Sequence, residues 1–241
     1  MLALIRKEWR LNRAIVIGCL VTMVMPYVIN VANTWINPSR GANLEPRDYV
    51  DAVKFAAYAC LAITVAFAAA FGGLAFAGER RERTAEFMAM LPVSRDAIIA
   101  SKLVVPAACL ATLIGVHVLV LLACGEWAVR IGLRRQDAQD ALYAAMFAVA
   151  YAVAVFGIAW ALSVFLRSAA IAGTITIAIG VGMLFGMMAW GDRVHRFLHE
   201  RNYVRSDSEF GTIFIICGTV GLIGLVAIAA SSLHYRRRVA P

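Results

Sequence analysis

Long stretches without a charged residue alternate with short charged stretches along the whole chain. Six uncharged runs stand out, each 23 to 26 residues long. They lie between Arg13 and Arg40, Lys54 and Glu79, Lys102 and Glu126, Asp140 and Arg167, Arg167 and Asp192, and Glu209 and Arg236. A transmembrane helix needs about 20 apolar residues to cross a hydrocarbon core about 30 Å thick. Each run is therefore long enough for one membrane-spanning helix and too short for two.

The pattern within the runs indicates helices rather than a barrel. Strands of a transmembrane barrel alternate apolar and polar residues in segments of about ten, and these runs do not alternate. Of the 241 residues, 62% are hydrophobic and 16% are charged, whereas soluble domains have about 45–50% and about 25%. We therefore predict an all-α, polytopic membrane protein. Its six transmembrane helices are expected at about residues 14–36, 55–78, 103–125, 141–166, 168–191 and 210–235, within one transmembrane domain of residues 14–241.

The first 13 residues form a separate, basic segment. Apolar residues such as Leu4 and Trp9 alternate here with Arg6 and Arg10, which is typical of a helix lying in the membrane interface. The apolar run that follows is too long for a signal peptide and has no small-residue cleavage site. We predict an N-terminal interfacial helix at residues 1–13, followed by an uncleaved first span.

Basic residues gather at helix ends on one side of the predicted bundle. With six spans, both termini and the segment between the second and third spans lie on that side. Arg6-Lys7, Arg80-Arg81 and Arg236–Arg238 all adjoin helix ends there. Because Lys and Arg near span ends mark the cytoplasmic side, we expect both termini in the cytoplasm. The expected location is the bacterial inner (cytoplasmic) membrane, crossed several times.

The segment between the second and third runs, residues 79–102, is dense in charge and has a definite internal order. Its acidic residues recur at helical spacings of three and four among arginines, which supports a solvated helix. Phe87 and Leu91 follow on one side of that helix, and Pro92 stops it. Ser94 is suited to cap the next helix, which runs into the third span. This layout favours a short helix that binds another protein, and an ordinary charged loop is the alternative.

The same order of residues resembles the type-2 export family of ATP-binding-cassette (ABC) permeases. Eight positions match: Glu79, Arg80, Thr84, Glu86, Leu91, Pro92, Ser94 and Arg95; Arg83 stands where the family commonly has Gly. In that family this segment is a cytoplasmic coupling helix, between helices 2 and 3, that docks on the ATPase subunit. The resemblance therefore implies ATPase-coupling residues here. They are Glu79, Arg80, Arg83, Thr84, Glu86, Phe87, Leu91, Pro92, Ser94 and Arg95.

The resemblance implies the permease subunit of an ABC exporter, which couples ATP hydrolysis elsewhere to transport. The chain has no GxxxxGK[ST] motif, the P-loop that cradles nucleotide phosphates. ATP and Mg would therefore sit on a separate ABC ATPase subunit, and this chain would be neither an enzyme nor the carrier of a cofactor. The usual subunit composition in that family implies two permease subunits that act with two ATPase subunits. We expect a homodimer surrounded by membrane lipid, without a nucleic-acid partner.

Three other kinds of function are open to a chain of this pattern. A channel or secondary transporter would show buried charges or broken, repeat-related helices. No Asp, Glu, Lys or Arg lies inside any run, apart from Arg167 at a shared boundary. An intramembrane enzyme would need a nucleophile–base pair or a metal cluster, and neither is evident. A membrane sensor or a non-transporting partner protein is the alternative that the charged segment alone does not exclude.

Few side chains inside the runs offer chemistry. His117 lies in the third run, where it either lines a substrate path or, as we favour, hydrogen-bonds to a neighbouring helix. His195 and His199 are four residues apart, but a metal site needs more ligands than these two, so none is predicted. The five cysteines form no CxxC pair, and we interpret them as small buried hydrophobes.

Small residues indicate where helices come close together. Gly lets two helix backbones approach within a membrane. The candidates are Gly72-Gly73 in the second run, Gly182 and Gly186 in the fifth, and Gly218, Gly221 and Gly224 in the sixth.

Overall fold

The computed structural model describes residues 2–36, 46–81, 94–130, 136–166, 168, 170–183 and 207–238. It contains five long helices: α1 (Leu2–Ile36), α2 (Pro46–Arg81), α4 (Arg95–Arg130), α5 (Gln136–Phe165) and α7 (Asp207–Arg238). A shorter apolar helix covers Ala170–Met183. The described residues contain no strand, which confirms the all-α prediction.

Five helices are long and apolar enough to cross a membrane. Their apolar spans are Asn12–Asn33, Asp48–Ala77, Arg95–Cys124, Ala145–Phe165 and Phe214–Arg237. The predicted span at 168–191 is seen as a helix only over Ala170–Met183. At 1.5 Å per residue that helix is about 21 Å long, shorter than the hydrocarbon core of about 30 Å. Residues 184–206 lie outside the described residues, so a sixth crossing stays a prediction.

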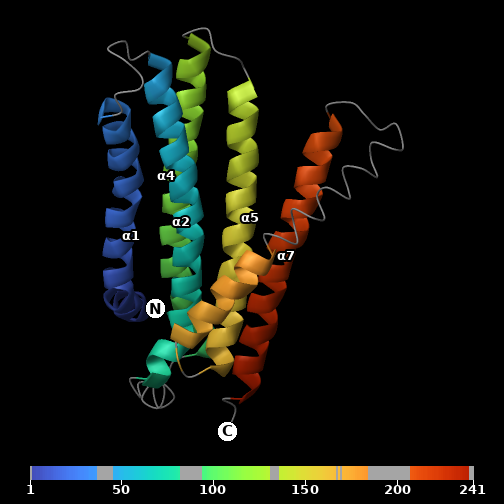
Figure 1. Cartoon of the computed structure of the whole chain (residues 1–241). Coiled ribbons are helices and arrows are strands. Elements are labelled where there is room, and N and C mark those ends of the chain that lie inside the picture. The colour runs from blue at the N-terminus through green and yellow to red at the C-terminus, as the bar shows by residue number, and fades with distance from the viewer. Residues whose placement is uncertain are drawn as a thin grey trace.

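The long helices stand side by side, and successive helices reverse direction up to α5 (Figure 1). α7 runs in the same direction as α5 and leans away from it where α7 begins (Figure 1). The start of α1, the end of α2, the start of α4 and the end of α7 therefore share one end of the bundle, which we call the basal end. Both described ends of the chain lie there, as an even number of crossings predicts.

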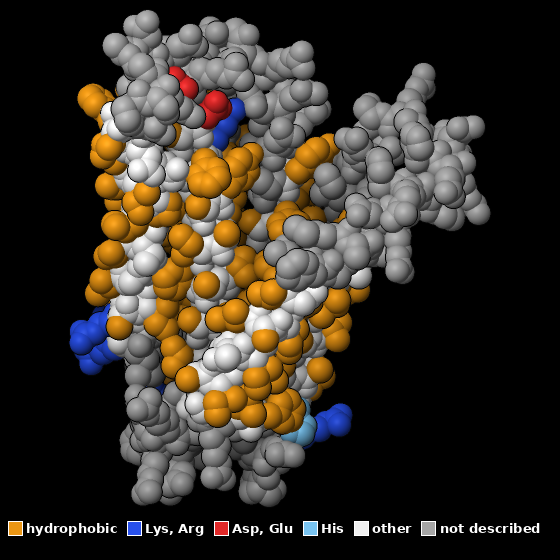
Figure 2. Space-filling view, in the orientation of Figure 1, with side chains coloured by type: hydrophobic (Ala, Val, Ile, Leu, Met, Phe, Trp, Pro, Cys, Tyr) orange, Lys and Arg blue, Asp and Glu red, His pale blue; other side chains and the backbone are white. Residues whose placement is uncertain are grey.

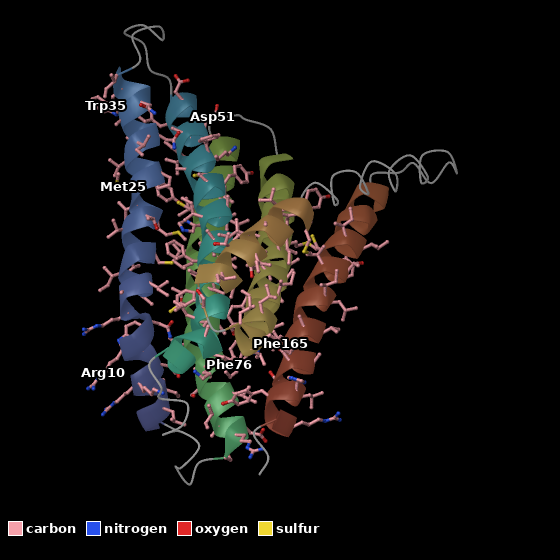
Figure 3. The ribbon with its side chains drawn as sticks, turned by 60° about the horizontal axis from the view of Figure 1, so that its bottom comes forward. Arg10, Met25, Trp35, Asp51, Phe76 and Phe165 are labelled. Atoms are coloured by element: carbon pink, nitrogen blue, oxygen red, sulfur yellow. The ribbon has the colours of Figure 1, made fainter. Side chains whose placement is uncertain are left out.

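The predicted interfacial segment and the first span form a single helix, α1. In Figure 1 the turns nearest the N-terminus bend away from the rest of α1. Glu8 and Asn12 are buried on its inner side, whereas Arg6, Arg10 and Arg13 are exposed; Figure 3 shows Arg10 pointing away from the bundle. The segment carries both buried and exposed polar residues because one face of its helix packs against the other helices.

Several glycines lie at close contacts between helices. A Cβ added at Gly72 of α2 would lie 2.6 Å from the Phe156 carbonyl oxygen of α5. A Cβ added at Gly157 of α5 would clash with the backbone of Gly224 of α7, and one added at Gly224 would clash with the backbone of Val153 and Ala154 of α5. The packing role predicted for Gly72 and Gly224 is therefore confirmed.

Two other candidate glycines behave differently. A Cβ added at Gly182 or at Gly218 would meet nothing within 4 Å among the described residues. The described part of the chain therefore shows no close helix contact at these two glycines. Sequence spacing does not distinguish Gly182 and Gly218 from Gly224, because all three lie among alanine-rich, apolar residues.

The outer surface of the bundle is apolar. Large hydrophobic side chains such as Ile17, Leu20 and Val24 of α1 are more than half exposed. Apolar side chains cover the helices on the face shown in Figure 2, while Lys and Arg appear toward the basal end, and Asp and Glu appear together with Lys or Arg at the other end. Such a surface suits contact with lipid tails and supports a multi-pass membrane protein.

Candidate functional site

The structure describes the two ends of the predicted coupling segment. α2 continues through Glu79 and Arg80 and ends at Arg81. Ser94 and Arg95 stand at the start of α4. The predicted coupling residues between these ends lie outside the described residues. They are Arg83, Thr84, Glu86, Phe87, Leu91 and Pro92.

Ser94 forms the N-terminal cap of α4. Its Oγ accepts a hydrogen bond from the Ala97 backbone N–H at 3.3 Å, and its carbonyl accepts from the N–H of Ala97 at 3.0 Å. Asp96 adds a negative charge in the first turn, where it interacts favourably with the helix dipole. The predicted cap is confirmed, and so is the continuous helix that runs from Arg95 into the third span.

The start of α4 also contacts the end of α7. The Arg95 side chain donates a hydrogen bond to the Arg236 carbonyl at 2.8 Å. The Arg236 guanidinium lies 2.7 Å from the Asp96 carboxylate, with side chains 47% and 67% exposed respectively. Exposed ion pairs of this kind are worth about 0–1 kcal/mol, so this contact is weak enough to open.

A buried ion pair lies deeper at the basal end. Lys102 of α4 and Glu8 of α1 are 2% and 5% exposed, and Lys102 Nζ lies 3.3 Å from Glu8 Oε1. Nζ also donates to the Ala75 carbonyl of α2 at 2.6 Å and sits 5.3 Å from the centre of the Phe76 ring. Three helices thus meet at one ammonium group, and Figure 3 shows Phe76 near the basal end.

The sequence pattern missed this pair. Lys102 stands at the boundary of an uncharged run, so it reads as a residue at the membrane edge. In the structure α4 begins at Arg95, which places Lys102 about two turns inside the helix. The absence of charge within the runs therefore did not mean an uncharged interior. One signal was present: Glu8 is the single acidic residue among the first 13.

Aromatic rings connect the same region to α5 and α7. Phe76 meets Trp160 of α5 edge-on, with ring centres 4.9 Å apart, and Tyr235 of α7 at 4.7 Å. Trp160 is fully buried, and its indole N–H has no hydrogen-bond partner among the described residues. The end of α2 is therefore the place where all the long helices except α1 meet around one ring.

His117 connects α4 with α1. Its Nδ1 lies 2.8 Å from the Tyr27 hydroxyl, and its Nε2 lies 2.6 Å from the Met23 sulfur. Its side chain is 3% exposed. These contacts confirm the interpretation of His117 as a histidine that is hydrogen-bonded to a neighbouring helix. A place on the substrate path stays a prediction.

We expect Tyr27→Phe to have only a small effect on stability. The change removes the hydroxyl that pairs with His117 Nδ1 and keeps the ring. Hydrogen bonds between helices in membranes average about 0.6 kcal/mol by double-mutant cycles, since partners also exist in the unfolded state. Chemical unfolding in mixed micelles would measure the change. A loss of more than about 2 kcal/mol would exceed the largest values of this class and contradict the assignment.

Two apolar grooves lie along the bundle. The first, about 630 Å³, runs between α2, α5 and the Ala170–Met183 helix. The second, about 560 Å³, runs between α5 and α7. Tyr151 of α5 donates a hydrogen bond to the Gly180 carbonyl, which joins two walls of the first groove. Aliphatic and aromatic side chains line both grooves, so they suit apolar groups.

The described residues hold no group of three or more His, Cys, Asp or Glu that could bind a metal. His195 and His199 lie outside them. All five cysteines are free, and four are buried. Burial among apolar side chains agrees with their interpretation as small hydrophobes.

Residues 5–184 match the family model for the ABC-2 family transporter protein. The chain belongs to the ABC-2 transporter family. The match covers about three quarters of the sequence and includes α1, α2, the coupling segment, α4, α5 and the Ala170–Met183 helix. The resemblance drawn from residues 79–102 is thereby confirmed. No curated protein and no solved structure matches the chain.

Membership makes this protein an ABC-2 type permease, a membrane transport component that is not itself catalytic. The permease has two continuous helices, α2 and α4, on either side of the predicted coupling segment. Both are anchored at the basal end by Lys102.

Proposed function

We propose that this permease is the membrane-spanning subunit of an ABC exporter, coupling ATP hydrolysis by a separate ATPase subunit to translocation. The observation that carries the proposal is the family match across residues 5–184, which contains the ordered charged segment. Residues 79–95 would dock on the ATPase, which would hold ATP and Mg. Two permeases, expected to be identical, would pair with two ATPases. Both termini would face the cytoplasm of a bacterial cell.

The helix arrangement supports a mechanism of rigid-body movement. Closure of the ATPase dimer on ATP would push the segment between α2 and α4. Since both helices run without interruption from that segment across the bundle, they would tilt as levers. Packed interfaces tend to switch between discrete arrangements. The permease would thus alternate between states that open toward one side of the membrane or the other.

The grooves favour apolar or amphipathic cargo over small ions. The larger groove is lined by residues such as Leu61, Val65 and Ile177, with tyrosines at several positions. Neither groove has a charged lining residue. Apolar walls with few polar groups are the usual lining of small-molecule sites.

A pull-down with the ATPase encoded beside the permease tests the proposal. We expect the wild type to retain the ATPase and to stimulate its ATP turnover. Glu86→Lys combined with Arg95→Glu reverses two charges of the coupling segment and should lose both properties, because docking of a charged helix depends on complementary charge.

The chain offers a matched control at the other end of α4. Glu126→Lys with Arg130→Glu reverses one acidic and one basic residue there and should leave ATPase binding intact. Binding that ignores the Glu86/Arg95 reversal would contradict coupling through this segment. Binding without any stimulation of turnover would favour a sensor or a non-transporting partner protein.

A further inference from the structure

The contacts of Lys102 connect the coupling segment to α1, a helix that does not adjoin it in sequence. Lys102 lies seven residues after Arg95, the first residue of α4. Its ammonium donates to the Ala75 carbonyl, six residues before the end of α2. Its second contact is with Glu8 of α1. Both helices that flank the coupling segment are therefore bound to each other and to α1 through one group.

This link differs in kind from the apolar contacts around it. Inside a membrane, apolar side chains gain little from meeting one another, because lipid tails are equally apolar. Separating Lys102 from Glu8 would break the contact between two buried opposite charges, which is strongly unfavourable. The basal ends of α1, α2 and α4 are thus held to move together.

The end of α7 contacts α2 through the ring of Tyr235, which packs against Phe76, but its polar contacts with α4 are exposed. It contacts the start of α4 through Arg236, whose partners are Asp96 and the side chain of Arg95. These groups are exposed, so water can replace their contacts when they separate. A displacement of α4 can therefore open the contact with α7 while it carries α1 along.

We propose that the Glu8–Lys102 pair is a positioning link that carries displacement of the coupling segment from α4 to α1. The proposal rests on the function proposed above. The pair itself touches no nucleotide or cargo. It converts a push on one segment into a joint movement of three helix ends, relative to α7.

Pulsed electron paramagnetic resonance on the permease–ATPase complex in nanodiscs tests this link. Nitroxide labels would be placed at exposed residues in a background without the five native cysteines. One pair joins Arg10 of α1 to Arg237 of α7, and the other joins Val104 of α4 to Arg237; these three residues are exposed. Each distance would be measured before and after trapping with ATP, Mg and vanadate. We expect both distances to change in the otherwise wild-type complex.

The decisive variant is Glu8→Leu with Lys102→Met, which removes both charges and so leaves neither one buried alone. In this variant the Val104–Arg237 distance should change on trapping as before, while the Arg10–Arg237 distance should stay at its resting value. Tyr27→Phe is the matched control, because it removes a different polar contact between the same two helices. It should keep both changes.

The outcomes separate this proposal from the one that it rests on. If α1 still moves with α4 in the double variant, the ion pair is not the link, and the exporter function is unaffected. If α1 stays in place in the wild type while α4 moves, the link is absent as well. If neither distance changes in the wild type although the ATPase is bound and trapped, both proposals are overturned.

Discussion

Replacing Gly224 with alanine is expected to destabilise the protein by about 1–3 kcal/mol, the usual range for overpacking. The new methyl group would meet the Val153 carbonyl and the Ala154 Cα of α5. Both belong to the backbone, which cannot turn aside as a side chain can, so α5 and α7 would have to separate. Gly224→Leu should prevent folding. Thermal unfolding of purified protein in detergent and the yield of monodisperse protein would measure the loss.

Gly218→Ala on the same helix is the matched control. Nothing among the described residues lies within 4 Å of the added Cβ. Alanine is favoured over glycine in a helix by up to about 1 kcal/mol. The control should therefore be neutral or slightly stabilising, opposite in sign to Gly224→Ala. Equal losses at both positions would mean that the backbones of α5 and α7 do not meet at Gly224.

Replacing Lys102 alone with methionine is expected to destabilise the protein by about 3–5 kcal/mol, as is usual when one partner of a buried ion pair is removed. The change leaves the Glu8 carboxylate inside the bundle without its ammonium partner. Glu8→Leu combined with Lys102→Met removes both charges and should recover most of the loss. Chemical unfolding in mixed micelles, measured for the two single variants and the double variant, would give the coupling between the residues.

The comparison of the single and double variants also distinguishes a buried ion pair from a solvated one. If the pair were in contact with water, each single change would cost little, and the two effects would simply add. A double variant that is less stable than either single variant would contradict the contact between Glu8 and Lys102. Asp96→Ala breaks the exposed pair with Arg236 and, for comparison, should cost no more than about 1 kcal/mol.

Much of the architecture follows from the sequence alone. Backbone N–H and C=O groups must be satisfied internally within the bilayer, so uncharged runs of this length have to be helices. The cap at Ser94 was likewise predictable, because it depends on neighbours within three residues. The family could be recognised from residues 79–95, whose order of charged, apolar and turn-forming residues is local. The uncharged runs do not show where a helix begins: α4 begins at Arg95, eight residues before the run that contains the third span.

Only the tertiary structure decided which polar and small residues are important in the interior. Glu8 and Lys102 are 94 residues apart, and no local pattern shows that a lysine at the edge of an apolar run turns inward to meet an acid on another helix. Gly224 packs against backbone while Gly218 is open, although both lie on one helix in similar sequence. Local chemistry determines that a segment is a helix in a membrane. Its functional contacts depend on which face meets a neighbour, and that is set by the packing of the whole bundle.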